Sequence, residues 1–148
     1  MRYLKSISGI TLAMMLLIAC GDDDVILTPQ ELRTQDMRGT WIIEAITIDG
    51  LDAKANYPDF KIDFQQNSLY SSVNGGRVFR PTGTWSWAGT ETVTQLQLDV
   101  FTDITINSFS TTELNSFPRT EMTWTFTYAL GGVRAGTNGN YAVTFLKL

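Results

Sequence analysis

The sequence predicts an all-β protein, an antiparallel up-and-down barrel of eight or nine strands that follows one short helix. From Arg38 onward, β-branched and aromatic residues alternate with polar residues at a period of two, as in half-buried antiparallel strands. Turn sequences rich in Gly, Asn and Asp separate these runs, and no helix-length amphipathic stretch lies between them. A run of adjacent short strands favours closure into a barrel, with a two-sheet sandwich as the alternative.

The first 20 residues predict a secretory leader. Arg2 and Lys5 form its basic start, and residues 7–18 form an apolar stretch shorter than the roughly 20 residues of a membrane-spanning helix. The sequence LIAC at residues 17–20 resembles the bacterial lipobox, where the leader is cut before a cysteine whose sulfur carries a lipid. The resemblance implies a signal peptide at residues 1–19 and lipidation of Cys20. The alternative is an ordinary signal peptide with a chance cysteine.

Residues 20–37 are expected to hold the lipidated cysteine, an acidic linker and a short helix. The run Asp22–Asp24 is either a solvated spacer or a sorting signal, because it resembles the export signal of surface-exposed lipoproteins in Bacteroidetes. That resemblance implies an outer-membrane lipoprotein at the cell surface, with the periplasmic leaflet as the alternative. Thr28, Pro29 and Glu31 form a helix start of the capping-box type, which predicts a helix to about Met37.

Residues 38–148 are expected to form the barrel. We place strands near residues 39–48, 59–66, 68–74, 77–81, 83–89, 93–101, 104–110, 119–130 and 140–148. Hairpin-type turns are expected at Asp49-Gly50, at residues 74–76 and at Asn138-Gly139, because Asn, Asp and Gly accept positive φ. The alternation predicts these inward-facing residues: Trp41, Phe60, Phe64, Trp85, Trp87, Trp124, Phe126, Tyr128, Tyr141 and Phe145.

Charge and composition exclude several classes of function. Two of the 11 basic residues lie in the leader and all 15 acidic residues follow it, so the chain from Cys20 carries 9 − 15 = −6. No basic patch for nucleic acid is visible. The absence of histidine, with a single cysteine, excludes a disulfide, a Cys/His zinc site and His-dependent catalytic triads. Asp99, Asp103, Glu113 and Glu121 are the candidate carboxylates for a glycosidase pair, but they fit solvated strand ends better. We therefore predict no enzyme, no metal and no cofactor.

The start of the first strand carries a family resemblance. Gly39-Thr40-Trp41 resembles the G-x-W signature of lipocalin and calycin barrels, and GTWSW at residues 83–87 and the closing strand at 141–147 extend the likeness. Together they resemble the lipocalin-like lipoprotein domains of Bacteroidetes over roughly residues 36–148. The resemblance implies that Trp41 closes one end of the barrel. It also implies a late basic residue packed on Trp41, a role that Lys147 or Arg134 is able to fill.

These features predict a membrane-anchored lipoprotein whose barrel binds a small apolar or amphipathic ligand. The candidate ligand-binding residues are Trp85, Trp87, Tyr128 and Tyr141, because indole and phenol rings combine apolar area with one hydrogen-bonding group. In the alternative, aromatic side chains fill the interior, as an eight-stranded barrel allows. The protein would then be a non-enzymatic accessory of a cell-surface assembly, acting through its loops and outer face, with an unknown protein partner.

Overall fold

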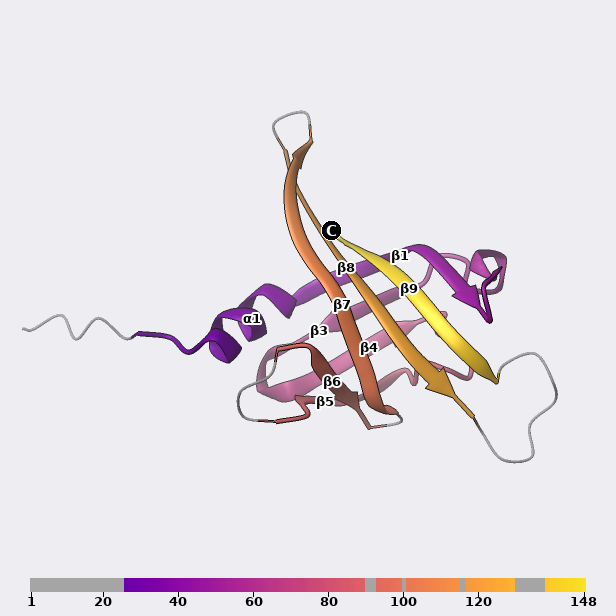
Figure 1. Ribbon diagram of the computed structural model, residues 1–148, viewed down its shortest axis with the longest axis horizontal. Coiled ribbons are helices and arrows are strands. Elements are labelled where there is room, and N and C mark those ends of the chain that lie inside the picture. Colours follow the sequence, from indigo (N-terminus) through magenta and orange to yellow (C-terminus); the bar gives the residue numbers. More distant parts are fainter. Residues whose placement is uncertain (1–25, 90–92, 100, 115–116, 130–137) are drawn as a thin grey trace, which may run out of the picture.

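The computed structural model in Figure 1 describes residues 26–89, 93–99, 101–114, 117–129 and 138–148. Its elements, in chain order, are α1 (Pro29–Met37), β1 (Gly39–Ile48), β2 (Leu51–Asp52), the 3-10 helix η1 (Lys54–Asn56), β3 (Lys61–Phe64), the 3-10 turn η2 (Gln66–Ser68), β4 (Leu69–Val73), β5 (Thr82–Trp87), β6 (Gln95–Leu98), β7 (Phe101–Leu114), β8 (Phe117–Tyr128) and β9 (Gly139–Lys147).

Eight strands close into an antiparallel barrel. Their order is β1-β3-β4-β5-β6-β7-β8-β9, and β9 pairs back with β1. The two-residue strand β2 pairs antiparallel with the end of β1. A tight turn at Asp49 and Gly50, whose φ angles are 50° and 81°, connects the two strands. The prediction of an all-β, up-and-down barrel with a short N-terminal helix is therefore confirmed.

The strand predicted at residues 77–81 is wrong. β4 pairs directly with β5, from Leu69 with Thr84 to Ser71 with Thr82, so residues 74–81 form the connection between them. Val78 and Phe79 are nevertheless buried, because this connection folds inward against the barrel. The apolar side chains that suggested a strand therefore pack in the core without a strand partner.

The short helix α1 begins where its sequence predicts. The Thr28 hydroxyl accepts the Glu31 backbone N–H at 3.2 Å, and the Glu31 carboxylate accepts the Thr28 backbone N–H at 2.7 Å. The hydrogen bond from the Thr28 backbone also lowers the pKa of the Glu31 carboxyl. Met37 is the one buried residue of this helix, so α1 meets the barrel by its last turn and by polar contacts.

Aromatic rings fill the barrel from end to end. Every residue predicted to face inward is buried except Trp87, which is half-buried against the core. Successive ring centroids lie 4.6 to 6.2 Å apart, within the range of favourable aromatic contacts. The contacts run through Trp85, Phe64, Trp124, Phe145, Phe60, Phe79, Phe126 and Tyr141. Among the described residues, these rings form a packed core inside the barrel.

The hairpin of β7 and β8 projects beyond the rest of the barrel (Figure 1). β6 pairs with β7 only as far as Thr105, whereas the pairing of β7 with β8 continues to Leu114 and Phe117. β9 reaches β8 only as far as Glu121. We call residues 107–114 and 117–120 the hairpin arm.

Candidate functional site

The signature tryptophan closes the α1 end of the barrel. Trp41 is fully buried, and its indole Nε1 donates to the Met37 carbonyl at 2.8 Å. The Lys147 ammonium lies 5.5 Å from the centre of the Trp41 ring and donates to the Asp36 carbonyl at 2.7 Å. Burial lowers the pKa of Lys147, and the charge of Asp36 partly opposes this shift. Lys147 thus packs on Trp41 as the resemblance implied; Arg134 lies outside the described residues.

Trp85 and Trp87 lie at this same end, beside α1. Their ring centroids are 5.9 Å apart, and the Trp87 indole Nε1 donates to the Thr34 hydroxyl at 2.9 Å. Trp85 is 4% exposed, and its Nε1 contacts no hydrogen-bond acceptor among the described residues. An unpaired buried donor costs about 1–3 kcal/mol, so Trp85 is a local defect in an otherwise satisfied core.

Tyr128 and Tyr141 lie at the opposite end. Their ring centroids are 6.3 Å apart in an edge-to-face contact, and the Tyr128 hydroxyl donates to the Arg77 carbonyl at 3.0 Å. Burial raises the pKa of Tyr57 and of Tyr141, and the hydrogen bond between these two hydroxyls raises the Tyr57 pKa further. The three tyrosine side chains form one buried cluster.

The four ligand-binding candidates therefore form two separate pairs. Along β1, Gly39 pairs with Phe64, which contacts Trp85, whereas Ile48 pairs with Tyr141. The nine residue steps between these two positions correspond to roughly 30 Å of strand. One small ligand does not reach both pairs.

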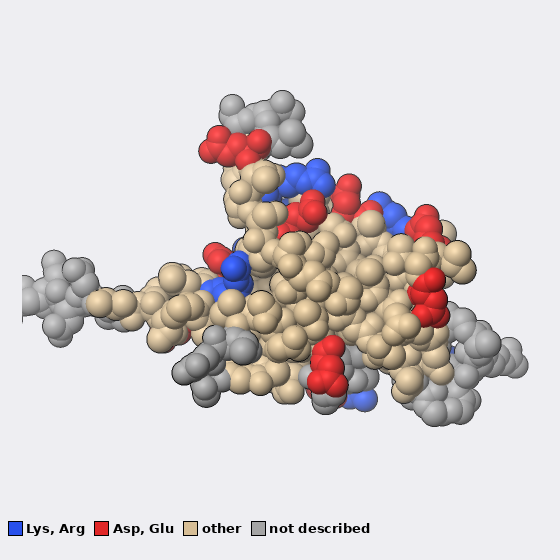
Figure 2. Space-filling view, in the orientation of Figure 1, with Lys and Arg blue, Asp and Glu red and all other residues tan. Residues whose placement is uncertain are grey.

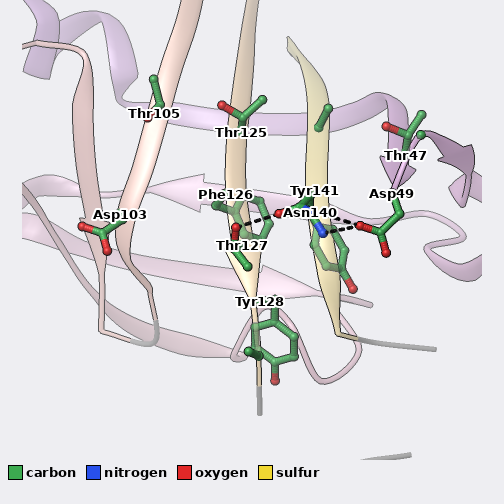
Figure 3. Close-up of a pocket in the computed structure, with 13 residues that line it drawn as sticks. Thr47, Asp49, Asp103, Thr105, Thr125, Phe126, Thr127, Tyr128, Asn140 and Tyr141 are labelled. Atoms are coloured by element: carbon green, nitrogen blue, oxygen red, sulfur yellow. Dashed lines mark hydrogen bonds between the residues drawn. The ribbon is translucent and has the colours of Figure 1, made fainter. Parts of the chain in front are cut away.

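A concavity of about 980 Å³ lies on the outer face of β1, β7, β8 and β9 beside the tyrosine cluster. Thr105 pairs with Thr125, and Ala142 lies between Thr125 and Thr47, so one row of small side chains crosses four strands. Figure 3 shows Thr105 and Thr125 side by side, with Phe126 and Tyr141 behind the strands. The described lining consists of Thr47, Asp49, Gly50, Asp103, Thr105, Thr125, Phe126, Thr127, Tyr128, Ala129, Asn140, Tyr141 and Ala142.

A hydrogen-bond network fixes one side of this concavity. One Asp49 carboxylate oxygen accepts from the Asn140 backbone at 2.9 Å and from the Asn140 side-chain amide at 3.1 Å. The Thr127 hydroxyl donates to the Asn140 side-chain oxygen at 2.9 Å, as the dashed lines in Figure 3 show. A Cβ atom at Gly139 would lie 2.7 Å from the Asp49 carboxylate, so the turn between β1 and β2 seats directly on β9.

The described lining is rich in hydrogen-bond acceptors. Asp49 and Asp103 contribute carboxylates, and no Lys or Arg belongs to the described part of the lining. Asp103 lies two residues from the Thr105–Thr125 pair, which places it about three strand spacings, or ~14 Å, from Asp49. This arrangement favours ligands that are neutral or cationic and that donate several hydrogen bonds, and it disfavours anions.

The four candidate carboxylates for a glycosidase pair do not come together. Asp99 accepts from the Tyr70 hydroxyl at 2.8 Å and lies 3.4 Å from the Arg80 guanidinium. Burial, with Asp99 as a further cause, raises the pKa of Tyr70. Glu121 pairs with Arg119, Glu113 lies on the hairpin arm and Asp103 lines the concavity. In the part of the chain that the structure describes, no group of three or more potential ligands is placed to hold a metal ion.

Cys20 and the acidic run lie outside the described residues. Within the described ranges, no helix has the length and apolar character to cross a membrane. Comparison with protein-family models, with curated proteins and with solved structures found no match.

Sequence reasoning missed Tyr57, Asp49 and Asn140 as site residues. Tyr57 belongs to an irregular connection, so no alternation marks it as inward. The sequence marked Asp49 only as a turn residue and Asn140 only as the start of the last strand, because their contact joins positions 91 residues apart in the chain. The one sequence signal was the presence of two turn dipeptides, Asp49-Gly50 and Asn138-Gly139, which the closure of the barrel brings together.

Proposed function

We propose that the protein is a lipid-anchored, non-enzymatic binding lipoprotein that takes a neutral, hydroxyl-bearing amphipathic molecule in the outer concavity. The observation that carries this proposal is the concavity of about 980 Å³, whose described lining places carboxylate, amide and hydroxyl groups beside small apolar side chains. Small-molecule sites combine a volume of roughly 300–1,000 Å³ with a few placed polar groups and an apolar wall.

The structure favours this outer position over the barrel interior. The ring contacts through the interior occupy the space that an enclosed apolar ligand would need. The ligand chemistry follows from the lining. Carboxylates accept hydrogen bonds from hydroxyl groups and repel anions, and the exposed Ala129 and Ala142, with the threonine methyl groups, supply apolar area.

A pair of probes that differ only in the headgroup tests the proposal. An alkyl glucoside and an alkyl sulfate of equal chain length, both below micelle formation, are titrated into isotopically labelled protein. We expect the glucoside to shift backbone amide signals of residues 47–50, 125–129 and 140–142, and the sulfate to leave them unchanged. Equal responses to both probes, or shifts confined to other residues, would contradict the proposed site.

A hydroxyl deletion supplies the matched variant. Thr47→Val removes a hydroxyl from the lining while keeping the side-chain volume, and Thr144→Val makes the same change on β9 outside the lining. We expect Thr47→Val to weaken glucoside binding about three- to tenfold, the effect of about one hydrogen bond, and Thr144→Val to leave it unchanged. Mass spectrometry of molecules carried by the protein from native membranes identifies the natural ligand directly.

The proposed anchor and family rest on the leader and on the barrel signature. LIAC at residues 17–20 supports lipidation of Cys20, and the contact of Lys147 with Trp41 supports a lipocalin-like lipoprotein barrel of the Bacteroidetes type. Cys20→Ser should abolish palmitate labelling and membrane partition; an unchanged partition would refute lipidation. Proteinase treatment of intact cells tests display on the outer membrane surface, with lysed cells as the control for cleavability.

A role as an interaction accessory is the second candidate function. The filled interior favours it, since a packed barrel offers partners only its ends, loops and outer face. The projecting hairpin arm adds an exposed phenylalanine, Phe117, at its tip, with 75% of its surface exposed.

A further inference from the structure

The hairpin arm has two backbone edges for which the described residues supply no strand partner. β7 has no strand partner opposite β8 beyond Thr105 among the described residues, and the last backbone bond on that side joins Ile106 to Thr94. β8 likewise has no described partner beyond Glu121 on the side of β9. An isolated two-stranded ribbon is marginally stable in water, and its free edge is a template for another strand.

The two edges differ in how they are protected. Pro118 stands on the β8 edge, and a proline lacks the N–H that an added strand would use. Arg119 and Glu121 follow it on β8 and carry opposite charges. The β7 edge over residues 107–114 reads NSFSTTEL, which has no proline, no lysine and one charged residue. The β7 edge is therefore the unprotected one.

The pairing register tells which groups face outward on this edge. Antiparallel pairs alternate between positions that share hydrogen bonds and positions whose N–H and C=O groups point away from the partner strand. Because Pro118 has no N–H, its pair with Glu113 fits the second kind, and the pairs Thr111–Thr120 and Phe109–Met122 follow it. The backbone groups of Phe109, Thr111 and Glu113 therefore point to the free β7 edge.

We propose that this edge pairs with the same edge of a second copy of the chain, antiparallel about a two-fold axis at Thr111. The outward-facing residues then form hydrogen-bonded pairs with themselves, Thr111 with Thr111 and Phe109 with Glu113. No like charges meet in this register, since the single charged residue of the edge faces a phenylalanine. The interface extends the two arms into one four-stranded ribbon and is independent of ligand binding.

Charge complementarity favours a second copy as the occupant. The Arg33 guanidinium of α1 lies 4.2 Å from the centre of the Phe109 ring, beside the base of the arm. A Glu113 side chain directly across from Phe109 lies on the same face of the sheet as that ring, within reach of Arg33. The two-fold axis creates this contact twice, once in each direction.

Figure 2 shows charged groups gathered along the arm while much of the visible barrel surface is uncharged.

Two proline variants test the pairing. Thr111 and Thr120 are cross-strand partners with hydroxyl oxygens 3.0 Å apart, and both backbone N–H groups point away from the hairpin. Thr111→Pro removes the outward N–H of the β7 edge, and Thr120→Pro makes the same change on the already protected β8 edge. Both variants lose the same hydroxyl contact, so Thr120→Pro controls for damage to the arm.

Sedimentation velocity of the purified intact protein up to about 1 mM provides the measurement. We expect weak, reversible dimerisation, because one strand pair is smaller than the roughly 800 Å² per partner of a standard interface. Thr111→Pro should raise the dimer dissociation constant at least about tenfold, and Thr120→Pro less than about twofold. A wild-type protein that stays monomeric over this range overturns the proposal, as does an equal effect of the two prolines.

A charge exchange separates this register from other contacts between copies. Arg33→Glu and Glu113→Arg each place like charges together and should weaken dimerisation, whereas the double variant should restore most of it. Circular dichroism confirms that each variant keeps its fold. Weakening by both single changes without recovery in the double variant would show that this register is wrong.

Discussion

Three tryptophans in the core differ in the acceptor that their indole N–H contacts. This difference predicts that tryptophan to phenylalanine lowers the free energy of unfolding by different amounts at the three positions. Trp41 Nε1 donates to the Met37 carbonyl at 2.8 Å, Trp124 Nε1 to the Met122 sulfur at 3.2 Å, and Trp85 Nε1 contacts no acceptor among the described residues. All three side chains are buried, with exposed fractions of 0%, 0% and 4%. Tryptophan to phenylalanine removes the same atoms at each site.

The magnitudes follow from two contributions. The lost apolar contact and the space left behind cost about 1–2 kcal/mol at each position. At Trp41, the loss of the donor to the Met37 carbonyl adds about 1–3 kcal/mol, for a total of about 2–5 kcal/mol. At Trp85, removing an unpaired buried N–H returns about 1–3 kcal/mol, so the net cost lies between about −2 and +1 kcal/mol. Trp124, bonded to a weak sulfur acceptor, should fall between them.

Urea denaturation followed by circular dichroism measures the free energy of unfolding for each variant. Comparing the three midpoints at an unchanged m-value isolates the hydrogen-bond contribution. Trp85→Phe is expected to be the least destabilising by at least about 2 kcal/mol relative to Trp41→Phe. Equal losses at the two positions would refute the assignment of Trp85 as an unpaired donor and would show that its N–H is hydrogen-bonded in solution.

Three further predictions concern the two ends of the barrel. Burial raises the Tyr57 pKa above 10, so above pH 10 the folded state keeps a proton that the unfolded state loses. The free energy of unfolding should therefore fall as the pH rises above 10. Tyrosinate absorbance that appears before unfolding would contradict this. Lys147→Met should cost about 1–2 kcal/mol in urea denaturation through loss of the bond to the Asp36 carbonyl, and Lys147→Arg less. Gly139→Ala should lower the melting temperature, because its methyl group meets the Asp49 carboxylate; an unchanged melting temperature would contradict the seating of this turn.

Local sequence rules predicted the parts of the fold that depend on neighbouring residues. The capping box of Thr28 and Glu31 marked the start of α1, and Asp49-Gly50 marked the first hairpin turn. Alternation identified the inward residues of the long strands. In a half-buried strand every second side chain faces inward, whichever strand it pairs with. The same reasoning failed at Val78 and Phe79, whose burial comes from an inward-folded connection with no alternating pattern.

The candidate site depended on strand register, which the sequence did not reveal. Trp85, Trp87, Tyr128 and Tyr141 share an inward or half-buried position, yet only the pairing of β1 with β3 and β9 shows that they lie at opposite ends. The concavity was missed for the same reason. Its lining residues come from four strands, and the outward side chains of each strand alone have the pattern of an ordinary solvent-facing side.

The position of α1 relates the proposed anchor to the proposed site. α1 contacts the end of the barrel that holds Trp41 and Trp87, and the chain before it leads back to Cys20 through residues 21–28. A coil of eight residues would have an average reach of about 15 Å, so a lipid on Cys20 would then hold the α1 end close to the membrane surface. The concavity lies beside Tyr128 and Tyr141 at the other end of the barrel. The proposed anchor would therefore turn the concavity toward the surrounding solution, where the proposed hydroxyl-bearing ligand would be met in water.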